Sequence, residues 1–557
     1  MSLLLLSSTS MRHLISFLCA LHIVIFVTYG QVTERPRPAA WDNIVFGGRF
    51  IDRFLPMVNG RTQEGIWGAD GVRKRYVDNG IEDSLRSYWC GSIVYDSTDR
   101  LYHQYVCGWD ENAVKGHNEW PHSIAYHAVS KQMNGPYCIR DTIGPGHNAE
   151  IYRAKNGTYV LYVIDKRYTS SSLNGPWQQD TFTFDRRDRK IIEGLSNLTF
   201  AQRPDGAYLM VCRGGGVWFS ADGLSPYYQV TDRRVYPAVE GEFEDPVVWR
   251  DHVQYHLVVN DWLGRIAFYL RSKDGVHWVT DPGEAYTPYI ALHEDGTKEE
   301  WFKFERMKVL QDQYGRAIQA NFAVIDVPKE KDKGNDNHSS KNITIPLNPG
   351  LLITLLDKQM PTDKTKTLQL KIQAEPGFDP LEAVDVKSLR FGASDQVNFG
   401  GGCKALNATR EGKDLVVTFD ATGHGITKEE FAPKLIGKSK DGKLLYGYTG
   451  VPWLSDRESI LSARMPVFAD DDKVHLTVEN FGEVHSEQAK MYLYQLHNGQ
   501  RTLIASADLT PVEPFGATRM TLATEKSFAV NGIHDFKIVI KADNDTMLDF
   551  DFRLGNK

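Results

Sequence analysis

The feature that most constrains the fold is a repeat of short β-strand patterns in residues 40 to 335. Each unit pairs an apolar strand with a second strand rich in Tyr and Leu, and Gly, Asn or Asp stands at the turn between them. Many units end in S-x-D-G or S-x-x-G-P. Units of this kind, spaced about 45 to 60 residues apart, predict one small sheet each. They begin CGSIVYDSTDRLYHQYVC, HNAEIYRAKNGTYVLYVI, SNLTFAQRPDGAYLMVC, EDPVVWRDHVQYHLVV and, less regularly, ERMKVLQDQYGRAIQANFAVI.

Five such units predict an all-β fold in which residues 40–335 form a five-bladed β-propeller, because stacked blades bury faces that a single small sheet would expose. An ordinary β-sandwich with chance similarity between units is the alternative. The charged segment KEKDKGNDNHSSKN, residues 329–342, is expected to be a linker. Alternating apolar and polar residues beyond it predict a β-sandwich accessory domain over 343–460 and an immunoglobulin-like β-sandwich over 461–557.

The N-terminus has the pattern of a secretory signal peptide. Arg12 and His13 precede an apolar run, Leu14 to Val27, and the small residue Gly30 follows it. This order predicts a signal peptide over residues 1–30 and a secreted or periplasmic protein. A single membrane anchor is the alternative, but the run is short for a spanning helix and no later segment has 18 consecutive apolar residues.

Charge and cysteine usage exclude several classes of protein. A formal net charge of −7 argues against a nucleic-acid partner and against a polybasic membrane anchor. No CxxC or HExxH motif indicates zinc. An odd number of cysteines remains after the signal peptide, so one or two disulfides or buried free thiols are both open. These cysteines are Cys90, Cys107, Cys138, Cys212 and Cys403.

Polar residues precede the first strand of every unit. In a propeller the innermost strands surround one axis, so we expect these residues to meet although they are far apart in sequence. Burying such groups is costly, which suggests a function. A structural ion pair, for example between Glu244 and Arg306, is the alternative. The expected ring is Cys90-Gly91, His147-Asn148, Ser196-Asn197, Glu244-Asp245 and Glu305-Arg306.

The clustered carboxylates suggest glycoside cleavage. That chemistry needs one carboxylic acid to protonate the leaving oxygen and a second carboxylate to activate water or attack the sugar. Repulsion and desolvation raise the pKa of one carboxyl in such a cluster. Glu244 is therefore predicted to be the proton donor, and Asp245 the neighbour that sets its pKa.

The same segments resemble a known group of enzymes. EDPVVWRDHVQYHLVV, HNAEIYRAKNGTYVLYVI and the repeated S-x-D-G-x-x-W are similar to the five-bladed β-propeller glycoside hydrolases of family 43 and their invertase-like and anhydrogalactosidase-like relatives. The resemblance covers residues 40–335. It implies an axial Asp as base, a second Asp as pKa modulator and a Glu as acid, often within E-G-P. The acid role carries onto Glu244, since Glu244-Asp245-Pro246 matches that element.

The base is not matched in the same way. Where these families have Asp-Pro in early blades, this sequence has Gly91-Ser92 and Asn148-Ala149. Some relatives hold an axial Ca²⁺, but no residue here demands one, so neither a metal nor a cofactor is expected. Asp83, shortly before the first repeat strand, is the first choice for the base, although a surface charge is an equal interpretation. The other candidates are Asp70, Glu82, Glu150 and Glu305.

Aromatic and polar side chains are the candidates for binding an oligosaccharide or polysaccharide. The insertion GWDENAVKGHNEWPHSIAYH, residues 108–127, is rich in Trp and His. Its rings either stack on the apolar faces of a sugar or pack the edge of the blade. The candidate binding residues are Trp89, Trp109, His117, Trp120, His122, His147, Asn148, Asn197, Trp262 and Arg306.

Three functions are compatible with these patterns. The first is a secreted glycoside hydrolase acting on plant or algal saccharides, which predicts converging carboxylates. The second is a non-catalytic carbohydrate-binding propeller, which predicts an aromatic-lined funnel with one usable acid. The third is an exported scaffold whose β-sandwich tail binds proteins, which predicts an exposed apolar patch.

Overall fold

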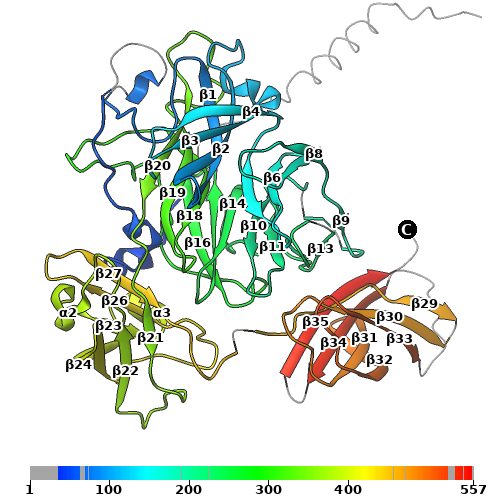
Figure 1. The fold of residues 1–557 in the computed structure, drawn as a ribbon. Coiled ribbons are helices and arrows are strands. Elements are labelled where there is room, and N and C mark those ends of the chain that lie inside the picture. The colour runs from blue at the N-terminus through cyan, green and yellow to red at the C-terminus, as the bar shows by residue number, and fades with distance from the viewer. Residues whose placement is uncertain are drawn as a thin grey trace, which may run out of the picture.

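The computed structural model describes residues 35–554, apart from 63–68, 73, 190, 193, 225, 456, 471, 525–533 and 543–544. The predicted signal peptide lies outside the described residues. Within the described residues, no helix is both long and apolar enough to cross a membrane. Nearly all regular structure is β, in three parts that Figure 1 shows in blue to green, yellow-green, and orange to red.

The first part, residues 86–346, contains five sheets of three to five strands that follow one another along the chain. Neighbouring strands pair antiparallel, except β9, which joins the third sheet parallel to β13. The sheets are β1 (Arg86–Asp96), β2 (Leu101–Asp110), β3 (Ile124–Ser130) and β4 (Cys138–Pro145); β5 (Glu150–Arg153), β6 (Tyr159–Val163), β7 (Lys166–Ser170) and β8 (Gln178–Asp180); β9 (Phe184–Asp185), β10 (Thr199–Gln202), β11 (Tyr208–Val211), β12 (Val217–Ser220) and β13 (Tyr227–Gln229); β14 (Phe243–Arg250), β15 (Tyr255–Asp261), β16 (Ile266–Ser272) and β17 (Val279–Thr280); and β18 (Lys303–Gln311), β19 (Ala317–Ile325) and β20 (Ser340–Pro346).

We call β1, β5, β10, β14 and β18 the first strands, because each stands at the same end of the spatial strand order of its sheet. These strands pack against one another. β1 lies against β5 and β18, and β14 lies against β10 and β18. Apolar clusters fill the spaces between neighbouring sheets, and one of them joins strands of the fourth and fifth sheets. The all-β prediction is confirmed, and the arrangement of small sheets is consistent with a β-propeller.

Equivalent turns connect the first two strands of three sheets. Gly157, Gly206 and Gly315 occupy these turns with φ of 92°, 83° and 77°. Side chains other than Gly are strained at such angles. The N-G, D-G and Y-G pairs of the repeat therefore have a structural reason, which is the tight reversal between the innermost strand and the next.

The predicted linker over 329–342 is wrong at its C-terminal end. Ser340 to Asn342 begin β20, and their side chains are buried. Ser340 pairs with Ile325 of β19, so the charged segment folds back as the connection within the fifth sheet. The high charge of this segment indicated an exposed linker. The pairing of β20 with β19 instead places Lys341 and Asn342 in the interior.

The described residues of 39–85 form no sheet. They contain the short 3₁₀ helices η1 (Ala39–Asn43), η2 (Phe50–Arg53) and η3 (Asp70–Val72), and Phe50 joins the core between the fourth and fifth sheets. A further 3₁₀ helix, η4 (Gly116–His122), lies in the connection between β2 and β3.

The second part is one seven-stranded sheet with its own apolar core, and it contains short helices that the sequence did not predict. We name residues 353–448 the middle module. Its elements are β21 (Ile353–Leu355), β22 (Thr367–Ile372), α2 (Pro380–Ala383), η5 (Val386–Ser388), β23 (Arg390–Gly392), α3 (Ser394–Asn398), β24 (Cys403–Glu411), β25 (Asp414–Asp420), β26 (Lys434–Lys438) and β27 (Leu444–Tyr448).

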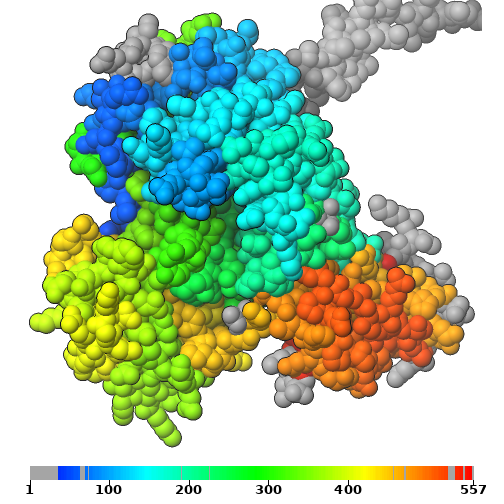
Figure 2. Space-filling model, viewed as in Figure 1, coloured from blue at the N-terminus to red at the C-terminus, as the bar shows by residue number. Residues whose placement is uncertain are grey.

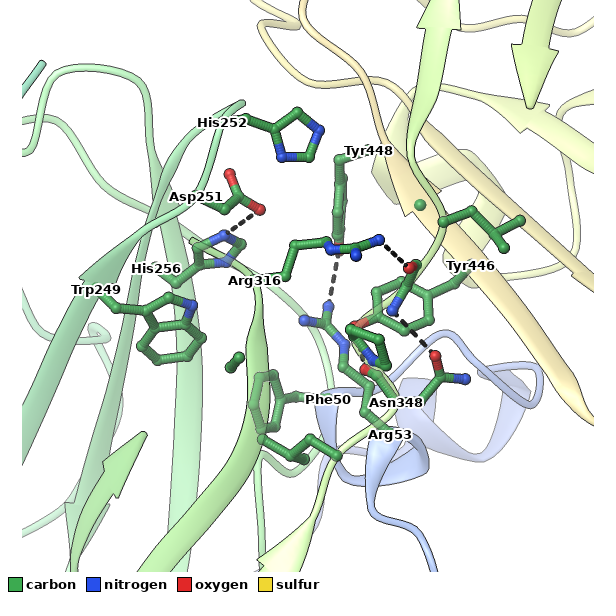
Figure 3. Close-up of a pocket in the computed structure, with 16 residues that line it drawn as sticks. Phe50, Arg53, Trp249, Asp251, His252, His256, Arg316, Asn348, Tyr446 and Tyr448 are labelled. Carbon is green, nitrogen blue, oxygen red and sulfur yellow. Dashed lines mark hydrogen bonds and ion pairs between the residues drawn. The ribbon is translucent and has the colours of Figure 1, made fainter. Parts of the chain in front are cut away.

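Buried cations join the middle module to residues 39–85 and to the fourth sheet, in the seam that Figure 3 draws. The Arg53 guanidinium lies 4.6 Å from the ring centroid of Phe50 and 4.5 Å from that of Tyr446. Arg53 also donates a hydrogen bond of 3.0 Å to the Tyr448 hydroxyl. Lys434 donates to the carbonyl of Gly47 at 2.9 Å. Residues of η2, the fourth sheet and β27 thus share one packed junction.

The third part, the terminal module (residues 461–554), has two four-stranded sheets that share one apolar core. It packs against the third and fourth sheets of the first part, where Phe481 joins their apolar core, Arg187 donates to Glu479 at 2.8 Å and Arg203 donates to the carbonyl of Phe481 at 2.5 Å. Figure 2 shows the terminal module in orange and red against the first part. Its strands are β28 (Leu461–Ala463), β29 (Val467–Asp470), β30 (Lys473–Asn480), β31 (Ala489–His497), β32 (Gln500–Leu509), β33 (Ala517–Ala523), β34 (His534–Ala542) and β35 (Asp545–Leu554).

Candidate functional site

Five residues at the heads of the five first strands share an uncommon backbone conformation. Each has a positive φ, between 50° and 60°, and none is Gly. In β1, β14 and β18 a register shift of the strand pairing falls at this position, which marks a β-bulge. Bulges and strained residues of this kind turn a side chain toward a site. We name these residues the central ring: Cys90, Asn148, Asn197, Asp245 and Arg306.

Members of the central ring contact one another in chain order. Asn148 donates to the side chain of Asn197 at 2.7 Å, and Asn197 donates to Asp245 at 3.2 Å. Arg306 donates to Asp245, with its Nη1 2.5 Å from Oδ1. Cys90 donates to the carbonyl of Ala149, the residue after Asn148, at 3.2 Å. The structure therefore brings together side chains that are up to about 216 residues apart in sequence.

Three carboxylates and four cations form a charge network at the central ring. Glu244 lies 3.5 Å from both Arg213 and Arg306. Glu305 lies 2.5 Å from Lys329 and 3.5 Å from Lys303. The network comprises Glu244, Asp245, Glu305, Arg213, Lys303, Arg306 and Lys329.

The three carboxylates differ in accessibility. The Glu244 side chain is 14% exposed, while those of Asp245 and Glu305 are 1% and 0% exposed. The Asn197 amide bridges the first two, since its Nδ2 lies 3.1 Å from Glu244 Oε1 and 3.2 Å from Asp245 Oδ1. Glu244 is therefore the carboxylate of the network that a molecule in solvent reaches directly.

Burial and charge move two of these carboxyl groups in opposite directions. Burial raises the pKa of Asp245 to about 7, against the attraction of Arg306, and the neighbouring Glu244 and Glu305 add to the rise. Burial also acts to raise the pKa of Glu305, but Lys329 and Lys303 outweigh it and lower this pKa to about 2. Near neutral pH the network thus combines a carboxyl that can carry a proton with one that stays ionised.

The residues that follow the central ring along the first strands form a second layer beneath it. Two residues beyond the ring lie Ser92, Glu150, Thr199, Val247 and Lys308. Lys308 is ion-paired with Glu150, and Glu150 also accepts hydrogen bonds from the Thr199 hydroxyl at 3.0 Å and the Phe200 amide at 2.9 Å. Glu150, a candidate base in the sequence, is therefore fully engaged beneath the ring.

A cavity of about 620 Å³ lies beyond this layer. Its lining comes from the later residues of the same first strands, including Tyr95, Tyr152 and Arg250. Because the Glu150–Lys308 layer stands between, this cavity opens at the opposite end of the first strands from Glu244.

Asp83 and Glu82 do not join the central ring. The Asp83 carboxylate accepts hydrogen bonds from the amides of Leu85 at 2.8 Å and Arg86 at 3.0 Å and from the Tyr88 hydroxyl, so it shapes the turn before β1. Glu82 is paired with Arg75 at 2.5 Å. The side chain of Asp70 lies outside the described part of the chain. The prediction of Asp83 as base therefore has no geometric support, because its acceptor oxygens are committed to a local turn.

The predicted aromatic residues form a cluster beside the ring, but most of it is buried. The ring centroid of His117 lies 4.5 Å from that of Trp89 and 5.4 Å from that of Trp109, and His147 lies 5.0 Å from Trp120. Trp89, Trp109, His117 and His147 are buried, while Trp120 is 38% exposed. The expected sugar-stacking role thus fits Trp120, whereas the buried rings support it from behind.

The histidines of this cluster are neutral. Burial lowers the pKa of both His117 and His147 well below the usual value, with Lys329 and Arg306 respectively as the strongest charged contributors. His117 hydrogen-bonds the Ser340 hydroxyl and His147 the Ser123 hydroxyl, each at 2.9 Å. His122, which pairs with Glu119 on the surface, is separate from the cluster.

Sequence reasoning missed the three cations Arg213, Lys303 and Lys329. Lys303 lies 4.7 Å from the ring centroid of Trp262, and Lys329 lies 4.9 Å from that of Trp89. Lys303 stands two residues before Glu305 on one strand, which alternation alone could have placed on the same face. Lys329 was assigned to a linker, and no local signal indicates that this segment returns to the ring.

The cysteines are free thiols wherever the structure describes them. Cys90 and Cys107 are buried, and burial raises the pKa of each. Of the two possibilities that the sequence left open, the structure has the free thiols.

Comparisons with known proteins show only weak similarity. No family model matches the sequence, and no curated protein matches it. Among solved structures, the GH43 BlXynB protein from Bacillus licheniformis aligns over 85% of this chain and 89% of its own at 9% identity, with a TM-score of 0.29. A point mutant of that protein aligns over the same shares at 10% identity, with a TM-score of 0.30. Alignments at these scores do not establish a shared fold, so function is inferred from the site itself.

Proposed function

We propose that this chain is an exported glycoside hydrolase whose five small sheets are the blades of a propeller and whose active site is the central ring. The single observation that carries the proposal is the convergence of Glu244, Asp245 and Glu305 from two neighbouring first strands. Glycosidases need two carboxyl groups in different protonation states beside one bond. The pKa of Asp245 is raised and that of Glu305 is lowered, so the cluster that contains Glu244 holds carboxyl groups in different protonation states.

Each carboxylate has a distinct role in this proposal. Glu244, at 14% the most exposed of the three side chains, is assigned as the proton donor to the leaving oxygen. Asp245, with a pKa of about 7, is partly protonated near neutral pH, and the Asn197 amide that bonds both carboxylates keeps them side by side. Glu305 is the second carboxylate, held in its ionised form by two lysines. Trp120 provides an exposed aromatic face for a sugar ring.

The test is the release of reducing ends from plant and marine-algal oligosaccharides by wild type and by Glu244→Gln. We expect the variant to lose turnover and to keep oligosaccharide binding. Glu240→Gln is the matched control, because Glu240 precedes Glu244 by four residues, is 86% exposed and pairs with Arg35 outside the network. Turnover that survives in Glu244→Gln would remove Glu244 from the mechanism.

A non-catalytic sugar-binding role is the second candidate. The observation that favours it is that every carboxylate of the network already has a cationic partner within 3.5 Å. Such pairing is also typical of architecture. Saccharide binding without turnover, in wild type and Glu244→Gln alike, would establish this second function.

A further inference from the structure

Two aspartates and one histidine meet at the turn between β1 and β2. Asp96 is the last residue of β1, Asp99 lies in the turn, and His103 is the third residue of β2. One carboxylate oxygen from each aspartate and one imidazole nitrogen lie within 4.8 Å of one another. The His103 side chain is 0% exposed and that of Asp99 is 31% exposed, so the imidazole reaches the cluster from the interior and solvent reaches it at Asp99.

A row of contacts behind His103 leads away from this cluster to another carboxylate. His103 Nδ1 lies 2.9 Å from His127 Nε2, and His127 Nδ1 lies 3.3 Å from Asp141 Oδ2. At the other end, His103 Nε2 lies 3.1 Å from Asp99 Oδ2. We name Asp99, His103, His127 and Asp141, in this order, the histidine relay. An ionised carboxylate, which accepts hydrogen bonds and donates none, stands at each end of it.

The histidine relay has one contact more than it has N–H groups. Each of its three contacts needs one hydrogen between the two facing atoms, and a neutral imidazole carries a single N–H. Two neutral rings therefore supply two hydrogens, whichever tautomers they take. The remaining contact needs a further positive charge, which is either a third proton within the relay or a metal ion at one of its ends. Both rings are fully buried, and burial disfavours the charged imidazolium form.

The Asp99 end of the relay is the end that can hold a metal ion, because Asp96 places a second carboxylate there. Amides of the turn hold both carboxylates in position through their Oδ1 atoms. Thr98 donates to Asp96 at 2.8 Å, and Leu101 donates to Asp99 at 3.0 Å. The carboxylates are therefore arranged before any ion arrives, and the Oδ2 atom of each is left to coordinate it.

Neighbouring side chains of the protein do not supply the missing charge. No lysine or arginine of the described residues lies within 4.0 Å of either carboxylate of the cluster. Arg140 attracts Asp99 from beyond that distance, and its guanidinium donates to Asn174 at 2.8 Å. A cation bound from solution is thus the partner that the cluster can accept.

We propose that Asp96, Asp99 and His103 bind a divalent transition-metal ion, with Zn²⁺ as the expected occupant. Imidazole nitrogen and carboxylate oxygen are ligands of Zn²⁺, and water completes its coordination on the exposed side. With the ion on His103 Nε2, His103 Nδ1 donates to His127, and His127 donates to Asp141. Such support of a metal-binding histidine through its second ring nitrogen is usual. This site is separate from the central ring, and the inference does not depend on the proposed function.

The experiment measures metal binding by the full-length mature protein, prepared without a histidine tag and freed of metal by a chelator. Calorimetric titrations with Zn²⁺, Mn²⁺ and Ca²⁺ give stoichiometry and affinity, and thermal melts with and without Zn²⁺ give the stabilisation. We expect one Zn²⁺ per chain, bound at least about tenfold more tightly than Ca²⁺, which prefers roughly six to eight oxygen ligands. The melting temperature should rise with Zn²⁺, because an ion that binds the folded state stabilises it.

Variants assign the ion to the cluster. Asp99→Asn and His103→Gln should each weaken Zn²⁺ binding at least about tenfold, since the loss even of a group that supports a ligand costs about 10- to 100-fold. Asp110→Asn is the matched control, because Asp110 is an exposed aspartate outside the cluster that likewise accepts from the amide two residues later, at 2.9 Å. If His103→Gln fails to fold, Asp99→Asn and Asp96→Asn carry the same comparison.

Each outcome decides for or against the site. Zn²⁺ binding that is lost in Asp99→Asn and kept in Asp110→Asn would support it. Absence of Zn²⁺ binding by wild type would overturn it and would leave a third proton as the charge within the relay. Zn²⁺ binding that persists unchanged in both Asp99→Asn and Asp96→Asn would also overturn it, because the ion would then lie elsewhere. Tighter binding of Ca²⁺ than of Zn²⁺ would overturn the assignment of His103 as a ligand.

Discussion

Two regions of the molecule bury cations among aromatic rings, and they use them differently. At the seam of the middle module, Arg53 faces aromatic rings and the Tyr448 hydroxyl, and Lys434 is held by backbone carbonyls. At the central ring the cations face carboxylates. The seam encloses a cavity of only about 30 Å³, which holds about a water molecule or two, whereas the ring has exposed charged groups.

The difference shows how buried charge can serve architecture or chemistry. A cation surrounded by π faces and carbonyl oxygens is satisfied without any group that titrates near neutral pH. A cation beside carboxylates shifts their pKa values and so prepares them for proton transfer. The seam also has carboxylates, since Asp251 pairs with His256 at 2.9 Å and Glu375 with Arg316 at 2.6 Å. What separates the candidate active site is the convergence of Glu244, Asp245 and Glu305 on one cluster.

The largest expected effect breaks the ring and leaves the seam unchanged. Glu244→Gln should lower turnover about 10³-fold, since general acid catalysis contributes on the order of 10²- to 10⁴-fold. The melting temperature should stay close to that of wild type, because Glu244 is the least buried carboxylate of the network. Initial rates with a cleaved oligosaccharide, beside a thermal melt, measure both quantities. A large drop in melting temperature would instead make Glu244 a structural residue like those of the seam.

The next effect concerns the layer beneath the ring. Lys308→Met leaves Glu150 buried without its ion partner, and we expect a loss of about 3 kcal/mol in the free energy of unfolding. The double variant Glu150→Gln with Lys308→Met should recover much of that loss, because no uncompensated charge remains. Denaturant titration of the three proteins measures the difference. Equal stability of the single and double variants would contradict the assignment of Glu150 and Lys308 as a buried ion pair beneath the central ring.

At the seam, Arg53→Ala should cost about 2 to 3 kcal/mol of stability through lost cation–π contacts and a new cavity. Activity per folded molecule should remain within about twofold of wild type, because the seam is separate from the ring. Thermal unfolding and initial rates at low temperature test the two statements. A strong loss of activity in the folded variant would show that the middle module controls the site.

The smallest effect is a pH dependence with a defined sign. The folded pKa of Asp245 is about 7, above the unfolded value of 3.8, so the folded state binds more protons between these values and stability falls as pH rises through that window. Glu305, with a folded pKa of about 2, contributes in the opposite sense, and its stabilisation is lost as pH falls from about 4.5 toward 2. We expect the two groups together to favour a stability maximum near pH 4.

Asp245→Asn isolates the first of these groups. In the variant, the decrease in the free energy of unfolding between about pH 4 and 7 should be smaller than in wild type by about 1 to 2 kcal/mol. Melting temperatures of wild type and variant across this range measure the slope, with Asp42→Asn at an exposed ion pair as control. An unchanged slope in Asp245→Asn would show that Asp245 is ionised throughout, as in a purely architectural pair.

Several features of the fold and site follow from local sequence. Strand patterns, turn glycines such as Gly157 and Gly206, and the alignment of the five units predict the all-β fold and the five residues that head the first strands. Glu244, Asp245 and Glu305 could be grouped in this way because a repeat places equivalent positions at one axis. Two-residue alternation and turn chemistry are properties of neighbouring residues, so they are visible without tertiary contacts.

Other features depend only on how distant segments pack. Lys329 belongs to a segment whose charge indicated a linker, yet it reaches Glu305 because β20 returns to the fifth sheet. Asp83 looks equally available in sequence, yet amides two and three residues away occupy its carboxylate. Trp109 and His117 look like a binding surface, yet they are buried behind Trp120. Partners, burial and pKa values arise from three-dimensional neighbours, which a single sequence does not specify, so the tertiary structure alone decided which charges and rings the site presents.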